Sequence, residues 1–336
     1  MKNKAYIILS MLMSALMLTS CIDVEEELSE GESFMGTVHY TGNAPKGAPL
    51  YTVAVRFIRF MPVQRIFKGG VPGEANVPSG HYKSYGFSSG SNDFTSAHKN
   101  IVNQGKPFSE LYISQATHGG TYNAYNSYSD YVNPLKNTLY ICSSPVYDIY
   151  PDTETSVPLS FKAVSLQLDV NFSIRKEQGA EPYVIDKVET ELSGIPSRID
   201  ICSGNIDCTE THKVTYTTTV PDNTYNTERL RCKGSMKVLS VIPPESSTAT
   251  TGPGILQVHI HVTTQGGKRK VLHGQINLNS TIRNARITSY SKDGTSLTNN
   301  VRTATLNISD ECVIDGNAVK AKTGGGDKWR TAEPGS

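Results

Sequence analysis

Hydrophobic and polar residues alternate along much of the chain, and a period of two is typical of β-strands with one buried face. The clearest run extends from Val164 to Arg175, where every second residue from Val164 to Ile174 is apolar and the residues between them are polar. The same alternation recurs at 256–262, with Leu256 and Val262 on the apolar side. Both runs predict half-buried antiparallel strands that turn one face to solvent.

Further segments have the composition of strands and are separated by clusters of Gly, Pro, Asn and Ser. They are 34–40, 51–61, 137–142, 183–192, 213–220, 235–241, 270–278 and 303–308. The period of an amphipathic helix is hard to find anywhere in the chain. Many short strands with turns between them predict an all-β protein built from antiparallel β-sandwiches.

Two sandwiches in tandem fit the length better than one. The segment 150–158 contains two prolines and lacks periodicity, so we expect a domain boundary there. An N-terminal β-sandwich is then expected at 34–152 and a C-terminal β-sandwich at 153–316. Residues 317–336 are rich in Gly and Lys, and a flexible tail is expected for them.

The N-terminus has the parts of a bacterial export signal. Lys2 and Lys4 give a positive start, and residues 5–18 form an apolar run that is shorter than the ~20 residues needed to cross a bilayer. The tetrapeptide Leu18-Thr-Ser-Cys21 follows and resembles the lipobox of bacterial lipoproteins. That resemblance implies a signal peptide at 1–20 and acyl chains on Cys21 that anchor the protein to a membrane. The alternative is an ordinary signal peptide with a chance cysteine.

Residues 21–33 are expected to form a lipidated acidic tether. Asp23 and five glutamates, the last of them Glu32, lie within residues 22–32, and the segment has no basic residue. Such a segment cannot bury enough apolar surface to fold. It also resembles the export signal of Bacteroidota surface lipoproteins, which implies display on the outer membrane at the cell surface. A plain flexible linker accounts for the acidity almost as well.

Composition and charge limit the class of partner and the possible disulfides. The formal net charge is +1 and charged residues make up 19 % of the chain, so nucleic acid is not expected as a partner. Five cysteines remain after Cys21, and an odd number cannot pair completely within the chain. Free thiols and a small loop closed by Cys202 and Cys208 both remain open.

Motifs of catalysis are absent from the sequence. It has no phosphate-binding loop, no Gly-x-Ser-x-Gly nucleophile elbow and no His-Glu-x-x-His zinc helix. His259 and His261 are expected on one face of a strand, and we interpret them as solvent-facing rather than as metal ligands. His273 could join them only if its strand lies alongside. No enzyme activity, metal or cofactor is therefore expected.

A tyrosine-rich stretch is the best candidate for ligand contact. Tyr122, Tyr125, Tyr128 and Tyr131 lie among Ser, Asn and Gly. Tyrosine offers contact area at low entropic cost, and small polar residues adapt their hydrogen bonds. A possible contact loop for sugars or protein ligands is predicted here. A polar surface loop whose rings cover the edge of a sandwich is the alternative.

Several segments together resemble a known family. Val77-Pro-Ser-Gly-His-Tyr-Lys-Ser-Tyr-Gly-Phe87 is similar to the strand that follows a Pro-Gly turn in fimbrillin-like lipoproteins of Bacteroidales. The run 157–172, followed by Leu192-Ser-Gly-Ile-Pro-Ser197, looks like the start of their second domain. Gly324-Gly-Gly-Asp-Lys-Trp329 is similar to the tail of a subgroup.

The resemblance implies two transthyretin-like sandwiches in tandem. It also implies a surface adhesin or a fimbrial component, either an anchor or an accessory subunit, that binds partners through sheet edges and loops. The partners implied are fimbrial subunits or ligands on host or bacterial surfaces. An alternative function is a glycan-binding surface lipoprotein of a polysaccharide-uptake system.

Overall fold

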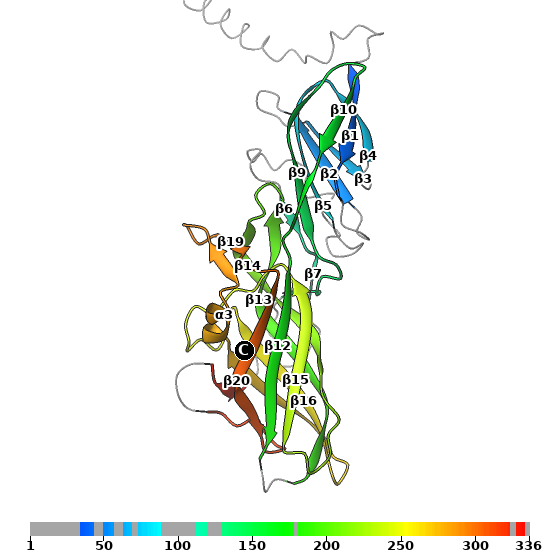
Figure 1. Cartoon of the computed structure of the whole chain (residues 1–336). Helices are drawn as coiled ribbons and strands as arrows, with labels where there is room; N and C mark the ends of the chain where they lie inside the picture. Colours follow the sequence, from blue (N-terminus) through cyan, green and yellow to red (C-terminus); the bar gives the residue numbers. More distant parts are fainter. Residues whose placement is uncertain are drawn as a thin grey trace, which may run out of the picture.

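The computed structural model describes residues 34–43, 50–56, 63–68, 73–88, 112–119, 130–177, 181–322 and 327–332. Strands dominate these residues, and one short helix, α3 (Asn279–Asn284), accompanies them. The prediction of an all-β chain is therefore confirmed. Figure 1 shows an elongated molecule with β1 and its neighbours at one end and the longer strands from β12 onward at the other.

Two small sheets form the N-terminal end. In one sheet β1 (Met35–Thr41) pairs antiparallel with β4 (Gly73–Pro78) and parallel with β10 (Glu154–Pro158). The other sheet has the order β11 (Ser160–Ala163), β9 (Tyr140–Ile149), β5 (Gly80–Ser88), β2 (Leu50–Arg56), β3 (Val63–Lys68). Apolar side chains from both sheets, Val38, Val77, Tyr82 and Ile149 among them, pack into one cluster.

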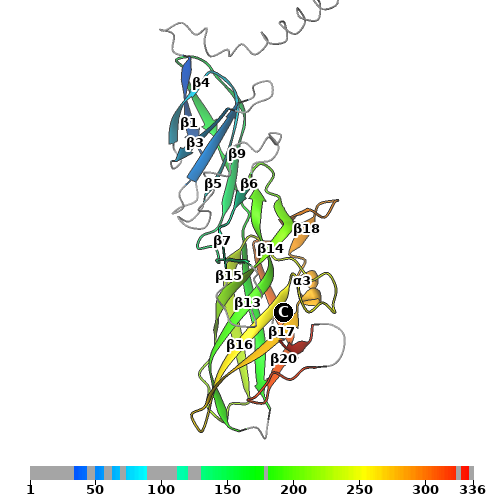
Figure 2. The same ribbon diagram turned by 180° about the vertical axis from the view of Figure 1, so that it is seen from behind.

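A larger sheet forms the C-terminal end. Its described strands follow the order β20 (Thr303–Ile314), β12 (Leu166–Lys176), β15 (Arg229–Val238), β14 (Ile206–Thr219), β13 (Tyr183–Asp200), β16 (Ile255–Thr264), β17 (Arg269–Asn277), β21 (Trp329–Thr331). Apolar residues from all of these strands contribute to one core cluster. Figure 2 shows β13, β16 and β17 on the side opposite to the β12 and β15 layer of Figure 1.

β12 confirms the clearest pattern in the sequence. From Leu166 to Ile174 every second side chain is buried, and those between are partly exposed. β15 lies antiparallel on one side and β20 lies parallel on the other. The parallel neighbour was not predicted, because alternation reports which face is buried and not which strand lies alongside.

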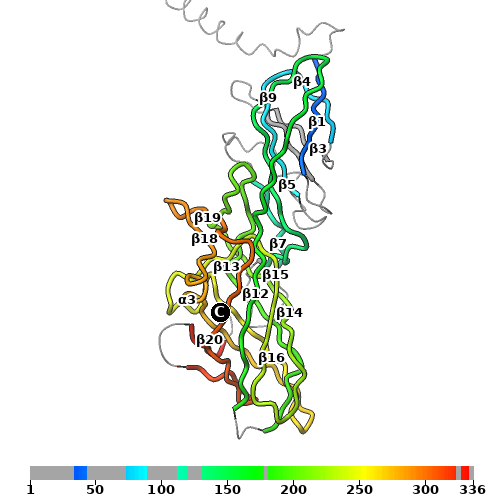
Figure 3. The backbone as a smooth tube through the Cα atoms, in the orientation of Figure 1, coloured from blue at the N-terminus to red at the C-terminus, as the bar shows by residue number. Residues whose placement is uncertain are grey.

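The two ends share strands across the expected boundary. β10 and β11 follow residue 152, yet they pair with β1 and β9 of the N-terminal end. Conversely β6 (Tyr112–Ser114) pairs with β13, and β8 (Asp130–Val132) pairs with β14 and with β7 (Thr117–Gly119). Between β5 and β9 the chain therefore passes the larger sheet, where β6, β7 and β8 lie, and then runs back to the N-terminal end (Figure 3). A boundary at one position does not describe this pairing.

A mixed apolar cluster fills the junction. It combines Phe87 and Ile141 from the N-terminal end with Ile199, Ile206 and Leu297 from the C-terminal end. Leu297 lies in β19 (Ser296–Asn299), which pairs with β14 and with β18 (Thr288–Tyr290). Buried apolar area at the junction favours a fixed arrangement of the two ends.

The C-terminal segment is attached to the larger sheet, which differs from the expected flexible tail. β21 pairs antiparallel with β17, and the Trp329 side chain is 0 % exposed. Its backbone N–H and its indole N–H donate to the carboxylate and the carbonyl of Asp310. The flexible tail was predicted from the Gly and Lys content, and that content does not show that one aromatic side chain is buried and holds the segment in place.

The described cysteines are free thiols, so Cys202 and Cys208 do not close the small loop considered above. Burial raises the pKa of Cys208 to about 11, and Cys142 and Cys232 are buried. Within the described part of the chain, no helix has the length and apolarity to cross a membrane.

Candidate functional site

Most of the predicted site residues lie outside the described residues. These are Cys21, Tyr122, Tyr125 and Tyr128. Lipidation and the tyrosine contact loop therefore stay predictions for them.

Tyr131 is described, and it is packed rather than exposed. It lies in β8 beside Lys213 of β14, and its side chain is 2 % exposed. Its hydroxyl donates to the Glu191 carboxylate at 3.1 Å, and its ring stacks with that of His118 at a centroid distance of 6.0 Å. In this position Tyr131 fastens β8 to the sheet and does not present its ring to solvent.

Tyr131 belongs to a buried polar cluster on the side of the sheet that faces away from the core. We name Tyr131, Glu191, Lys213, His259 and His273 the Glu191 cluster. Glu191, Lys213, His259 and His273 lie on β13, β14, β16 and β17, and Tyr131 lies on β8. Glu191 and His259 are on adjacent strands, and His259 is in register with His273. All except His273 are less than a tenth exposed.

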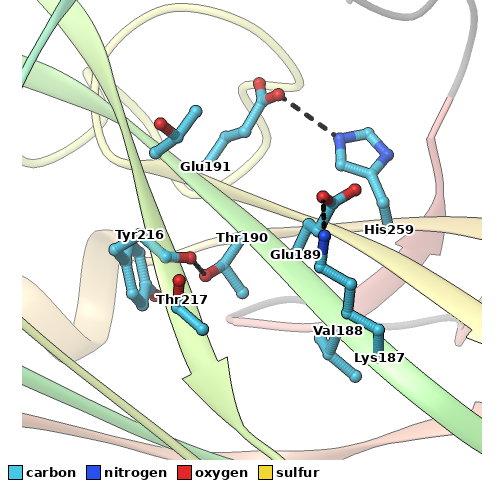
Figure 4. Close-up of a pocket in the computed structure, with 9 residues that line it drawn as sticks. Lys187, Val188, Glu189, Thr190, Glu191, Tyr216, Thr217 and His259 are labelled. Atoms are coloured by element: carbon cyan, nitrogen blue, oxygen red, sulfur yellow. Dashed lines mark hydrogen bonds and ion pairs between the residues drawn. The ribbon is translucent and has the colours of Figure 1, made fainter.

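The contacts within the Glu191 cluster are short. His259 Nε2 lies 3.5 Å from Glu191 Oε1, and Figure 4 shows the two side chains pointing toward each other across adjacent strands. His259 Nδ1 lies 2.7 Å from His273 Nδ1, with the two rings edge to face at 4.9 Å between centroids. A cavity of about 200 Å³ beside them is lined by Glu189, Glu191 and His259 with hydroxyl groups of β14.

The groups around Glu191 favour its ionised form although its side chain is buried. Burial acts to raise the pKa of Glu191, but the hydrogen bond and charge of His259, followed by Lys213 and Tyr131, outweigh it, so this pKa lies below its ordinary value. Burial lowers the pKa of His273 to about 4, and nearby histidines add to that effect. At neutral pH, Glu191 is therefore ionised and His273 is neutral.

The expectation for the histidine pair was wrong in part. His259 is 3 % exposed and Gln257 is buried beside it, whereas His261 is partly exposed and pairs with Glu189 at 2.9 Å. Side chains from β13 and β17 close over His259, which makes this side of the sheet a second buried layer rather than a wet face. His273 does lie alongside. Among the described residues no group of three or more His, Cys, Asp or Glu side chains is arranged to hold a metal ion.

The outer edge of β20 is a second candidate site. β20 is paired with β12 along one edge. Over 303–309, no described strand or backbone group bonds to the opposite edge. An edge of this kind presents unpaired N–H and C=O groups that a strand from another chain can bind.

A polar pocket of about 450 Å³ is a third candidate. It lies where β6, β14 and the β18–β19 hairpin meet, and its lining includes Tyr112, Asp200, Asn205, Asp207 and Asp293. The Arg198 guanidinium carbon lies 3.9 Å from the centre of the Tyr112 ring, and Arg198 also approaches Asp207 at 3.6 Å. Carboxylate, amide and hydroxyl groups around an aromatic ring are the groups with which proteins bind sugars.

Comparisons with known proteins give structural neighbours but no sequence relatives. No protein-family model and no curated protein sequence matches the chain. The structural neighbours include candidate adhesins of Bacteroidales and a fimbrial anchor. A candidate adhesin from Bacteroides ovatus is 11 % identical over 86 % of this chain and 93 % of its own, with a TM-score of 0.46.

The fimbrial anchor protein Mfa2 from Porphyromonas gingivalis is 12 % identical over 75 % of this chain and 86 % of its own, with a TM-score of 0.41. A candidate polysaccharide-binding protein from Bacteroides thetaiotaomicron is 11 % identical over 81 % of this chain and 89 % of its own, with a TM-score of 0.36. None of these neighbours is named as an enzyme. At such values the function of this chain has to be argued from its own residues.

Reasoning from the sequence missed the Glu191 cluster. Its members come from strands far apart in the chain, and each occupies a polar position of an alternating strand. Glu191 gave no signal of its own in the sequence, because a carboxylate at a polar position of an alternating strand is expected on a wet face, where it needs no buried partner. Its burial and the identity of its partners depend on strand order, which alternation does not report.

Proposed function

We propose that this chain is a lipoprotein of the outer membrane, anchored through Cys21 and displayed on the cell surface, where it acts as an adhesin or as a fimbrial anchor or accessory subunit. The proposed activity is binding and not catalysis. Its partners are fimbrial subunits or ligands on host or bacterial surfaces, bound through sheet edges and loops.

One observation carries the proposal beyond the export signal, namely the outer edge of β20, to which no strand among the described residues bonds. Soluble proteins usually protect long edge strands with charges, prolines or bulges, because an open edge invites pairing with another chain. The outer edge of β20 over 303–307 has neither a charged residue nor a proline, and its register with β12 is regular up to Asn307, after which the register shifts. Such an edge suits a protein that joins other subunits by strand addition.

Protease treatment of intact cells tests the proposed location. We expect the C-terminal part, followed with an antibody, to be digested while a periplasmic marker stays intact. Survival of the band until the cells are lysed would place the chain inside the outer membrane, and the adhesin proposal would fall.

The anchor is tested separately with Cys21→Ser. We expect this variant to lose incorporation of radiolabelled palmitate and to leave the membrane fraction. Cys208→Ser is the matched control, because it removes a partly exposed thiol far from the signal and should keep both properties. Equal labelling of the Cys21→Ser variant would refute lipidation at this residue.

The polar pocket favours a second candidate function, a glycan-binding surface lipoprotein of a polysaccharide-uptake system. Saturable binding to one neutral polysaccharide, reduced by Asn205→Ala at the pocket mouth, would support it. Loss of the same binding in Tyr122→Ala/Tyr125→Ala would instead assign it to the tyrosine loop. Binding that survives in both variants would exclude both places as the glycan site.

A further inference from the structure

The outer face of the β12 and β15 layer carries a concentration of positive charge. Arg229, Arg231, Lys233 and Lys237 occupy alternate positions of β15 on the side away from the core, and Arg175 lies opposite Arg229 on β12. We name these five residues the basic strip. Four of them are exposed and Lys237 is partly exposed. The whole chain has a net charge of only +1, so charge is unevenly distributed over the molecule.

Carboxylates neutralise only one end of the basic strip. Glu311 of β20 contacts Arg229 at 2.7 Å and Arg175 at 3.2 Å. Within the described part of the chain, Arg231, Lys233 and Lys237 take part in no ion pair of the kind that Glu311 makes. Asp169 lies on the same face and accepts a hydrogen bond from Ser235 at 2.6 Å.

The arrangement costs stability. Arg175 and Arg229 are directly opposite each other across two antiparallel strands, where like charges are destabilising. Arg229, Arg231 and Lys233 follow one another at intervals of two residues, or about 7 Å along the strand, which is within the ~8 Å screening length at physiological salt, and Ser235 separates Lys233 from Lys237. Within the described residues the fold gains no ion pair from Arg231, Lys233 or Lys237, which indicates that they serve binding.

The surroundings indicate the chemistry of the ligand. Besides the carboxylates Asp169 and Glu311, the neighbours of the basic strip on β12 and β20 are uncharged polar side chains that can hydrogen bond to a sugar: Gln167, Asn171, Ser173, Thr303, Thr305 and Asn307. Asn171 and Asn307 are already joined at 2.9 Å, which holds their amides in place.

The same face lacks the features that other polyanions require. The outward positions of β12, β15 and β20 include no aromatic side chain on which a nucleobase could stack. They also include no large apolar side chain that could enter a lipid layer. A cationic face bordered by hydroxyl and amide groups fits an extended acidic sugar chain better than it fits a nucleic acid or a lipid layer.

We propose that the basic strip binds an acidic polysaccharide, with Arg231, Lys233 and Lys237 pairing with its sulfate or carboxylate groups. The polar side chains of β12 and β20 contact its hydroxyl groups. This inference rests on the proposed function and deepens it by naming the class of surface ligand. It shares no residue with the tyrosine loop or the polar pocket.

Binding of the purified full chain to three polysaccharides tests the proposal. Heparin represents sulfate groups, polygalacturonate represents carboxylate groups, and dextran is neutral. We expect saturable binding to heparin or polygalacturonate that weakens as salt is raised, and none to dextran. Arg231→Ser/Lys233→Ser should lose on the order of tenfold in affinity at low salt and show a shallower salt dependence.

The control variant is Lys268→Ser/Arg269→Ser. It removes the same charge from the exposed β16–β17 hairpin of the opposite layer, and its affinity should stay within about twofold of the original because these residues are remote from the basic strip. Matching circular dichroism spectra verify that both variants fold. Equal losses in the two variants would show an effect of net charge alone and would overturn the proposal.

Two further results would overturn it. One is equal affinity of the unchanged chain for dextran and for the acidic polysaccharides. The other is equal or tighter binding to double-stranded DNA or to vesicles of anionic phospholipid, which would assign the strip to general polyanion binding. Protease treatment of cells stays independent of these results, because a periplasmic chain that binds heparin through the strip would refute the location and not the ligand.

Discussion

Replacing Trp329 with alanine tests how firmly the C-terminal segment is attached to the larger sheet. Trp329 is fully buried, its ring packs against Phe172 at a centroid distance of 5.7 Å, and its indole N–H donates to the Asp310 carbonyl at 3.0 Å. A buried aromatic side chain removes about 150–250 Å² from water, worth roughly 4–6 kcal/mol at ~25 cal/mol per Å². Because alanine keeps part of that burial, we expect a loss of about 3–5 kcal/mol in the free energy of unfolding.

The matched variant is Trp329→Phe. It keeps most of the apolar contact with Phe172 and loses the indole hydrogen bond, so a loss of about 1–2 kcal/mol is expected. The order Trp, Phe, Ala separates the contribution of packing from that of the hydrogen bond. Equal losses in the two variants would mean that the hydrogen bond dominates.

Hydrogen exchange followed by mass spectrometry is the suitable assay, because a chain with several apolar clusters need not unfold in one step. Peptides from β17 and β20 should lose protection in Trp329→Ala, while peptides from β1 and β4 should keep it. In the original chain Trp329 is the only tryptophan, so its fluorescence reports on this site alone. Unchanged protection of β17 and β20 in the alanine variant would refute the inferred attachment.

Three other changes have definite expected outcomes. Asp327→Ala removes the carboxylate that accepts hydrogen bonds from the first backbone N–H groups of α3, and hydrogen exchange in that helix should rise by the equivalent of about 1 kcal/mol. Gly194→Ala should lose more than about 2 kcal/mol in urea unfolding, because Gly194 has φ +81° and a Cβ there would lie 2.6 Å from a backbone nitrogen. Gly266→Ala should be neutral, because a Cβ there would meet other atoms only at ordinary van der Waals distances of 3.8 Å and 3.9 Å. The pKa of His273 is about 4 in the folded chain and near 6.5 in the unfolded chain, so the unfolded chain binds more protons between pH 4 and pH 6.5. The free energy of unfolding should therefore fall as the pH is lowered from 6.5 to 4. His273→Gln should reduce that fall. An equally steep pH dependence in that variant would assign the titration elsewhere.

The strands were predictable wherever one face is buried and the other is wet. The predicted strands at 183–192, 213–220 and 303–308 all lie largely within β13, β14 and β20, although the structure extends each of them. Strand ends depend on neighbours that protect the last residues, and those neighbours come from distant parts of the chain. The sequence pattern is local, so it reports the centre of a strand better than its ends.

The side of β16 that faces away from the core shows where local patterns fail. Gln257 and His259 occupy the polar positions of an alternating strand, and a wet face was the natural expectation. They are buried because Glu191 and His273 approach from the two neighbouring strands. The order β13–β16–β17 has to be known before this burial can be inferred.

The parallel pairing of β12 with β20 has a consequence for the order in which the chain folds during synthesis. Asn171 and Asn307 are joined although 136 residues separate them, so β20 is synthesised long after β12. During that interval the edge of an apolar strand is open, and closing so long a loop is slow. Delayed closure leaves that edge open for longer, and an open apolar strand edge exposes the partly folded chain to aggregation.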